Sequence, residues 1–148
     1  MPFKFTGTLD KLMLKIDRAV IMMFGLGLAF VPAAMANPRS DACVALGKAR
    51  IALYSMLSAK TKSEQDSLKD KVQAASKELD SVLAGMTGTD AGVAADFKAV
   101  WEQFKATRDK EIIPDIYKGK AADARKLANG IQLERFGKMF DIMSCRAR

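Results

Sequence analysis

Hydrophobic positions recur every three or four residues through most of the chain after residue 40, and this period predicts amphipathic α-helices. The first helix is expected over residues 41–60, with Ser40 as its N-cap. Its apolar stripe is Leu46, Ala49, Leu53 and Met56, widened by Val44, Ile51 and Leu57. The second helix is expected from Ser63 to a stop at Gly85. Its apolar positions are Leu68, Val72, Ala75, Leu79 and Val82.

The second half of the chain repeats this pattern. Thr89 or Asp90 is expected to cap a third helix that carries Val93, Phe97, Val100, Trp101 and Phe104. A proline removes a backbone donor and crowds the preceding turn, so Pro114 either ends the third helix near Ile112 or interrupts it. The favoured prediction is a kink or a short break, followed by one more turn to Tyr117. A fourth helix is expected over residues 121–145, after a tight corner at Gly119. Its inward positions are expected to be Leu127, Ile131, Leu133, Phe136, Phe140 and Met143.

No segment alternates between apolar and polar residues with β-branched enrichment, so no strand is expected. Helices joined by short connections predict an all-α protein, an antiparallel up-and-down four-helix bundle over residues 37–148.

The first 36 residues have a different character. A basic segment that ends at Arg18 precedes an uncharged apolar run over residues 19–31. Ala34 and Ala36 then form a small-residue cleavage signal. The pattern predicts a signal peptide over residues 1–36, cleaved after Ala36, and a periplasmic protein. The alternative is a leader retained as a membrane anchor, and a membrane partner is expected only in that case.

The two cysteines are Cys43, near the start of the expected mature chain, and Cys145, near its end. An exported protein reaches an oxidising compartment in which disulfides persist. The first and last helices of an up-and-down bundle are neighbours, so a Cys43–Cys145 disulfide is predicted. The alternative is two separate buried thiols.

The sequence lacks residues that several kinds of catalytic and metal site usually require. The chain has no histidine, which removes the common catalytic triads, zinc sites and haem ligands. No cofactor, no metal and no enzymatic activity are expected. A thioether site at Met139 and Met143 is the metal alternative, and core packing is the preferred interpretation. The net charge is +7, but charges of both signs are interspersed, so no nucleic-acid partner is expected.

Polar side chains on or beside the apolar faces are the candidate ligand-binding residues. An arginine in such a place can hold a carboxylate with two parallel hydrogen bonds. The candidates are Arg50, Trp101, Arg108, Tyr117, Gln132 and Arg135. The alternative is ordinary ion pairing along the helices, of Arg108 with Glu102 or Glu111 and of Arg135 with Asp123 or Asp141.

One stretch resembles a known family. The motifs are Arg108-Asp109, residues 111–114, residues 117–119, residues 130–132 and Glu134-Arg135. They resemble the second hairpin of the periplasmic four-helix sensor domain of methyl-accepting chemotaxis receptors, over about the last third of the chain. The resemblance implies small ligands such as carboxylates bound between helices, often at a dimer interface. Those receptors continue into a second membrane span, whereas this sequence stops at Arg148.

The sequence therefore predicts an exported, non-catalytic, sensor-like domain that binds a small anionic ligand between helices and that can form a homodimer. The alternative is a periplasmic structural, protein-interaction or chaperone-like helical protein whose partner is another periplasmic protein. A cofactor or metal carrier is the third hypothesis.

Overall fold

Helices account for nearly all of residues 37–145, the part of the chain that the computed structural model describes. No strand occurs within these residues, so the predicted all-α class is confirmed. The expected signal peptide, residues 1–36, lies outside them, as do residues 146–148. Within 37–145, no helix is both long and apolar enough to cross a bilayer.

The first two helices are α1, Pro38–Ser58, and α2, Lys62–Gly85. The N-cap of α1 is Asn37, whose side chain accepts a hydrogen bond from the backbone N–H of Ser40 at 3.2 Å. The cap expected at Ser40 is therefore wrong, because Pro38 suits the first helical position and starts the helix earlier. Thr61 and Glu64 form a reciprocal capping box at the start of α2.

The third segment of the chain consists of four consecutive helical elements with no loop between them. They are the 3₁₀ turn η1 (Gly88–Asp90), the helix α3 (Ala91–Thr107), the π-helical turn η2 (Arg108–Ile112) and the helix α4 (Ile113–Tyr117). The expected turn up to Tyr117 is confirmed, and the irregularity that accommodates Pro114 is the π turn before it. Asp90 precedes α3, but its side chain accepts a hydrogen bond from Arg39 Nε at 2.8 Å instead of capping the helix.

The last segment consists of α5, Ala121–Asn129, and α6, Ile131–Ile142, which meet at Gly130. The prediction of one uninterrupted helix over residues 121–145 is therefore wrong. Gly130 has φ −93° and ψ −110°, and its carbonyl accepts the backbone N–H of Leu133 at 2.9 Å. A β-carbon at Gly130 would lie 3.0 Å from the carbonyl oxygen of Lys126.

Two inward positions expected in this segment are wrong, since Ile131 is 39% exposed and Leu133 is 44% exposed. Met143 is buried as expected, and the other buried residues of the segment are Ala124, Ala128, Gln132 and Met139. The physical reason for the two exposed positions is that Gln132, which lies between them, takes the inward position: it is 2% exposed, and its Nε2 donates to the Phe104 carbonyl at 2.9 Å. The residues on either side of it in the helix therefore turn outward.

Two expected core positions on α1 are also exposed, Val44 at 57% and Ile51 at 69%. The buried face of α1 is instead rich in alanine, as in Ala42, Ala45 and Ala49. These small side chains let α1 pack closely against α2.

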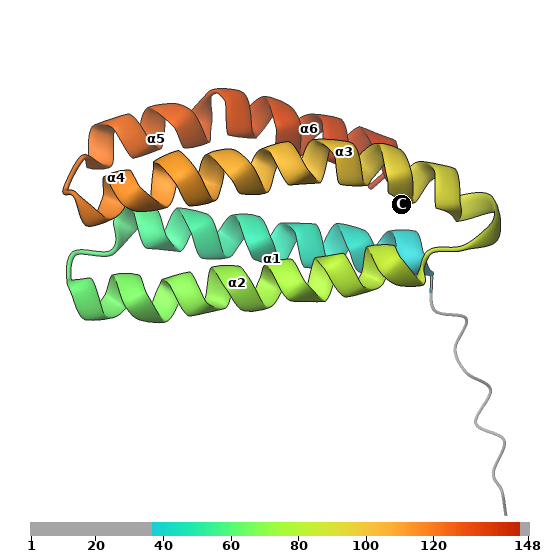
Figure 1. Ribbon diagram of the computed structural model, residues 1–148, viewed down its shortest axis with the longest axis horizontal. Helices are drawn as coiled ribbons and strands as arrows, with labels where there is room; N and C mark the ends of the chain where they lie inside the picture. Colours follow the sequence, from blue (N-terminus) through green and yellow to red (C-terminus); the bar gives the residue numbers. More distant parts are fainter. Residues whose placement is uncertain (1–36, 146–148) are drawn as a thin grey trace, which may run out of the picture. The chain divides into compact units, whose positions relative to one another are not determined.

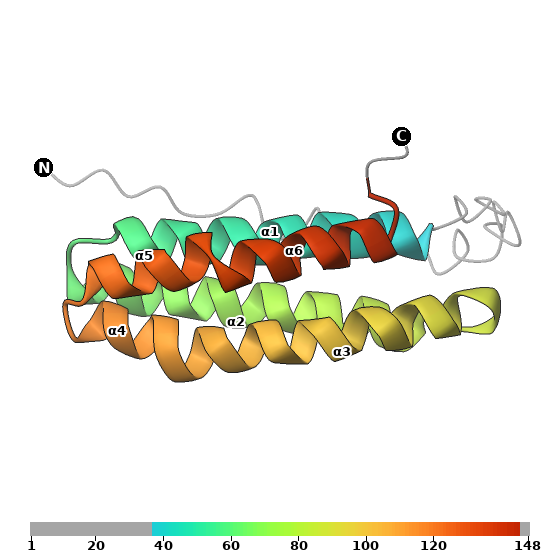
Figure 2. The ribbon, with the colours of Figure 1, turned by 90° about the horizontal axis from the view of Figure 1, so that it is seen from above.

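The segments lie as two pairs. Figure 1 shows α1 alongside α2, and α3 and α4 alongside α5 and α6. The view from above agrees, with α5 and α6 next to both α1 and the third segment (Figure 2). The closest packing is between α1 and α2, and α1 approaches α5 and α2 approaches α3 less closely. One core of buried hydrophobic side chains from all of these helices joins the two pairs, and particular side-chain contacts add to it.

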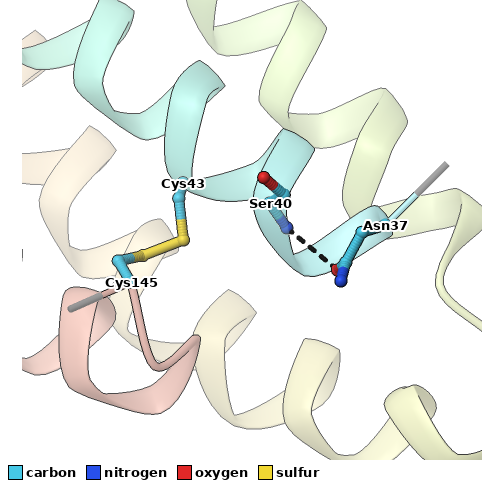
Figure 3. The surroundings of a disulfide bond; sticks show 4 residues. All are labelled: Asn37, Ser40, Cys43 and Cys145. Atoms are coloured by element: carbon cyan, nitrogen blue, oxygen red, sulfur yellow. Dashed lines mark hydrogen bonds between the residues drawn. A yellow bond between two sulfur atoms is a disulfide. The ribbon is translucent and has the colours of Figure 1, made fainter. Parts of the chain in front are cut away.

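One such contact is the disulfide between Cys43 and Cys145, whose Cα atoms are 5.7 Å apart. The bond joins the first turns of α1 to the turn after α6 (Figure 3). Ser144, with φ 57°, lies in that turn and directs the chain back to Cys145. The pairing is the one that the sequence predicts, and it is compatible with an exported protein in an oxidising compartment.

Removing the disulfide should destabilise the protein. The bond closes a loop with a sequence separation of 102 residues, and such a cross-link lowers the entropy of the unfolded chain. We expect Cys43→Ala with Cys145→Ala to lower the free energy of unfolding by about 2–4 kcal/mol. Urea denaturation followed by circular dichroism measures this, with the parent protein under reductant as the matched comparison. Equal midpoints for the oxidised parent and the double variant would contradict it.

Gly130 and Gly137 should respond oppositely to alanine. A methyl group at Gly130 meets the Lys126 carbonyl at 3.0 Å, whereas one at Gly137 meets nothing within 4 Å. We expect Gly130→Ala to lower the free energy of unfolding by about 1 kcal/mol, and Gly137→Ala to raise it by about 0.5–1 kcal/mol because alanine favours the helix. Stabilisation by both substitutions would show that Gly130 does not set the break.

Candidate functional site

The structure distributes the predicted ligand-binding residues over several interfaces instead of one site. Arg108 is 3% exposed and lies between η2 and α2. Its Nε and Nη2 donate to the carboxylate of Asp109 at 2.8 and 3.0 Å, and its Nη1 donates to Ser76 Oγ at 2.6 Å. Its carboxylate partner is thus its neighbour in the π turn, and not Glu102 or Glu111. The N–H groups with which Arg108 could hold a ligand carboxylate are therefore already bonded to Asp109 and Ser76.

Trp101 lies next to Arg108, whose Cζ is 5.7 Å from the indole centroid. The indole is fully buried, and its Nε1 donates to Asp80 Oδ1 on α2 at 2.7 Å. Lys105 donates to both carboxylate oxygens of Asp80 at 3.1 Å. Burial lowers the pKa of Lys105, but its hydrogen bonds with Glu102 and Asp80 outweigh burial, so the pKa is raised. This cluster fastens α3 to α2.

Gln132 and Arg135 fasten α6 to α3. Gln132 is 2% exposed, and its Nε2 donates to the carbonyl of Phe104 at 2.9 Å. Arg135 Nη1 donates to Thr107 Oγ1 at 2.8 Å and to the carbonyl of Gln103 at 3.2 Å. Arg135 Nη1 also donates to Gln132 Oε1 on α6 at 3.2 Å, so its acceptors are neutral oxygens of α3 and α6 and not the carboxylates of Asp123 or Asp141.

Tyr117 and Arg50 lie at two further interfaces. The Tyr117 hydroxyl donates to Asp66 Oδ1 at 2.6 Å and ties α4 to α2. This bond is the main reason that the pKa of Tyr117 is raised to about 12. Arg50 is half-buried, with its Cζ 4.3 Å from the ring centroid of Phe136 and 5.2 Å from that of Tyr54. No carboxylate pairs with Arg50 within residues 37–145.

Within the described part of the chain, every buried side-chain nitrogen and oxygen has a hydrogen-bond partner. The ligand role predicted for these residues stays a prediction, and the structure gives each of them a contact within the chain. A ligand site is therefore better sought where polar groups line an open hollow.

Such a hollow, of about 210 Å³, lies between α1 and α5. It is lined by Tyr54, Leu57, Ser58, Arg125 and Asn129. Arg125 and Asn129 are four residues apart on α5, so they share one face of that helix. On the opposite wall, Tyr54 and Ser58 are related in the same way on α1.

The break at Gly130 shapes this hollow. Because α5 ends at Asn129, the Tyr54 hydroxyl can approach both the Ala128 carbonyl oxygen at 3.1 Å and Asn129 Oδ1 at 3.0 Å. The single hydroxyl proton is donated to one of these two acceptors at a time. In either case, the Nδ2 protons of Asn129 have no partner within residues 37–145.

The charge in the lining of this hollow is positive. Arg125 is its charged lining residue, and no carboxylate within residues 37–145 pairs with it. One contact is described for its guanidinium, from Nη2 to the Leu57 carbonyl at 3.3 Å. A guanidinium with free N–H groups beside a free amide can hold a carboxylate by charge-assisted hydrogen bonds.

A second hollow, of about 410 Å³ between α2 and α3, differs in charge. Its rim carries Asp80 and Glu102 as well as Lys98 and Lys105, and Lys105 is already paired with both acids. This mixture of signs does not select an anion. The hollow between α1 and α5 is thus the better candidate.

Sequence reasoning included Arg50 but missed Tyr54, Arg125 and Asn129. The spacing of Arg125 and Asn129 was a usable signal, since it places two polar side chains on one face of a helix. The sequence predicted that the first and last helices are neighbours, but it did not show which face of the last helix meets α1, or that α5 ends at Asn129.

No group of three or more histidine, cysteine, aspartate or glutamate side chains within residues 37–145 could hold a metal ion. No known protein family, curated protein or solved structure matches this chain.

The Tyr117–Asp66 hydrogen bond predicts a late phenol titration. The pKa of Tyr117 is raised from 10.0 to about 12, so this contact contributes fully below pH 10 and is lost as the pH rises through about 12. Absorbance at 295 nm should show one of the two tyrosines ionising near pH 12, and Tyr117→Phe should remove that step. Asp66→Ala should move the step toward pH 10, while Asp70→Ala should move it less. No phenol ionising above pH 11 in protein that is still helical would contradict the contact.

Proposed function

We propose that this chain is an exported, non-catalytic binding protein that takes a small organic anion in the hollow between α1 and α5. The observation that carries the proposal is the lining of that hollow, in which Arg125 is the charged group and has no carboxylate partner within residues 37–145. A carboxylate there would replace water at a guanidinium that the fold leaves unpaired.

The proposal includes the finer architecture that the sequence predicts. The four segments would form an antiparallel up-and-down bundle, preceded by a signal peptide that is removed after Ala36 on export to the periplasm. The N-cap of α1 at Asn37 supports that cleavage site, because the first residue of the proposed mature chain would cap the helix that begins at Pro38. The disulfide supports an oxidising destination.

The size and donors of the hollow define the ligand. A volume of about 210 Å³ accommodates a carboxylate with a short body and not a large cofactor. Arg125 would supply charge and parallel donors, and Asn129 Nδ2 would supply one more hydrogen bond. Arg50 lies against the Tyr54 ring, so it adds positive potential nearby while remaining outside the lining of the hollow.

A binding role fits the lining better than catalysis. The hollow contains two hydroxyls, Tyr54 and Ser58, and neither has a histidine or carboxylate beside it in the lining to act as a base. The Tyr54 hydroxyl is engaged with α5. A ligand held by Arg125 and Asn129 on one side and by Ser58 on the other would draw α5 toward α1. That coupling gives the sensor-like role a physical basis.

Acetate binding tests the proposal. In a calorimetric titration at constant ionic strength, we expect a dissociation constant on the order of millimolar, because a ligand of four heavy atoms has little surface to bury. Arg125→Ala should weaken binding by about tenfold or more, since it removes a charge-assisted pair. Arg125→Lys should retain part of the affinity, because it keeps the charge but loses the planar fork.

The matched control is Lys126→Ala, which removes the same charge one residue away from the hollow. It should leave acetate binding unchanged within a factor of two or so, because a solvated charge outside the hollow contributes little. Equal losses in the two alanine variants would show nonspecific attraction to a basic protein. Retained binding in Arg125→Ala would place the anion elsewhere.

A further inference from the structure

The anion hollow is the end of a longer groove. A hollow of about 830 Å³ along α1 and α2 shares Tyr54 and Ser58 with it. A third hollow, of about 460 Å³, continues along the same two helices and shares Ile51, Ser55, Leu68 and Lys71 with the second. The three hollows form one track from Arg125, past Tyr54, to Lys48 and Glu78.

The middle of this track combines apolar and small polar side chains. Ile51 is 69% exposed, and Leu68 is half-buried beside it. Besides Tyr54, the residues with hydroxyls that line the groove are Ser55, Ser58, Ser63 and Ser67. This lining suits a chain that carries its own hydrogen-bonding groups, because an alkyl chain would cover the hydroxyls without replacing their bonds to water.

Some of the charged side chains along the groove are already bonded within the chain, and others are left to pair with a ligand. Lys48 and Glu78 pair with each other at 2.6 Å at the far end. Glu64 accepts hydrogen bonds from the backbone N–H groups of Lys60 and Thr61. Lys71, in the middle, has no ion-pair partner within residues 37–145. The groove therefore offers an unpaired cation at its centre, besides Arg125 at its end.

The length of the groove sets the size of the ligand. Lys48 and Ser58 mark its two ends on α1, and ten residues of α-helix span about 15 Å. An extended peptide covers that distance with four or five residues at about 3.3 Å each.

We infer that the ligand is a peptide with a free C-terminal carboxylate. The terminal carboxylate binds Arg125 and Asn129, and the preceding four or so residues lie extended along the α1–α2 groove. An acidic residue near the middle pairs with Lys71, while small or apolar side chains cover Ile51 and Leu68. This inference rests on the proposed function, since it takes the anion of that hollow to be the end of a peptide.

A titration with matched peptides tests this directly. The probe is acetyl-Ala-Ser-Glu-Ala-Leu with a free C-terminus, compared with its C-terminal amide, acetate and decanoate. The peptide acid is expected to bind at least tenfold more tightly than acetate. The amide should bind at least tenfold more weakly than the acid, because it lacks the charge that Arg125 recognises. Decanoate should gain nothing over acetate.

Two tryptophan variants separate the groove from the anion hollow. Ser55 lines both groove hollows and is exposed, so Ser55→Trp should fill the track without disturbing the core. It should weaken the peptide acid by at least tenfold and leave acetate binding as it was. Gln73→Trp, at an exposed position of α2 outside the groove lining, should affect neither ligand.

The outcomes distinguish the two proposals. If acetate binds through Arg125 but the peptide acid binds no more tightly, the peptide inference is overturned and the proposed function stands. Equal binding of acid and amide also overturns it, as does tighter binding of decanoate, which would indicate a fatty acid. A dimer that Ser55→Trp dissociates, with no peptide binding, would show that a second copy covers the groove. If no ligand binds, both proposals fail.

Discussion

The contact between the Tyr54 hydroxyl and the end of α5 is the interaction on which the candidate site depends. It reaches the Ala128 carbonyl and the Asn129 amide across the junction between the two helix pairs. It is possible because α5 ends at Asn129, before the break at Gly130. In a continuous helix the Ala128 carbonyl would also accept the backbone N–H of Gln132, whereas here its described partner is the Tyr54 hydroxyl. The break, the tyrosine and the hollow are thus parts of one arrangement.

Besides the shared hydrophobic core, a few specific contacts hold the two helix pairs together. On the side of α2, Asp80, Ser76 and Asp66 accept from Trp101, Arg108 and Tyr117 in turn. On the side of α1, the fasteners are the disulfide and Tyr54. Polar contacts of this kind specify how two apolar faces meet more than they add to stability. The helices α1 and α5 are packed less closely than α1 and α2, and a ligand can enter between them.

The sequence predicted the helical class, the extent of most helices and the cysteine pair, because these follow from local periodicity and from the position of the two cysteines. It did not predict the exposure of Ile51. Apolar spacing shows that a helix has a buried face, but alanines on the other side of α1 provide that face by letting α2 approach closely. The same limit applies to Ile131 and Leu133, which are exposed because Gln132, between them, takes the inward position.

The candidate site was harder to predict than the fold. Arg108 and Arg135, which look like ligand clamps in the sequence, have their acceptors within the chain, and the π turn that lets Arg108 reach Asp109 has no clear signal before Pro114. Arg125 looked like an ordinary surface charge. What distinguishes it is the absence of an acidic neighbour in three dimensions, within the described residues, and the hollow beside it. Both are properties of helix packing, and sequence spacing does not contain them.

The most direct test of the account is a nuclear magnetic resonance titration of uniformly ¹⁵N-labelled protein with acetate, followed at the side-chain amide of Asn129 and the Nε–H of Arg125. The account predicts that these two signals shift together and saturate with one dissociation constant, while the Nε–H of Arg108, held by Asp109, stays in place. Saturable shifts centred on Arg108 or Arg135, with Asn129 unchanged, would contradict it.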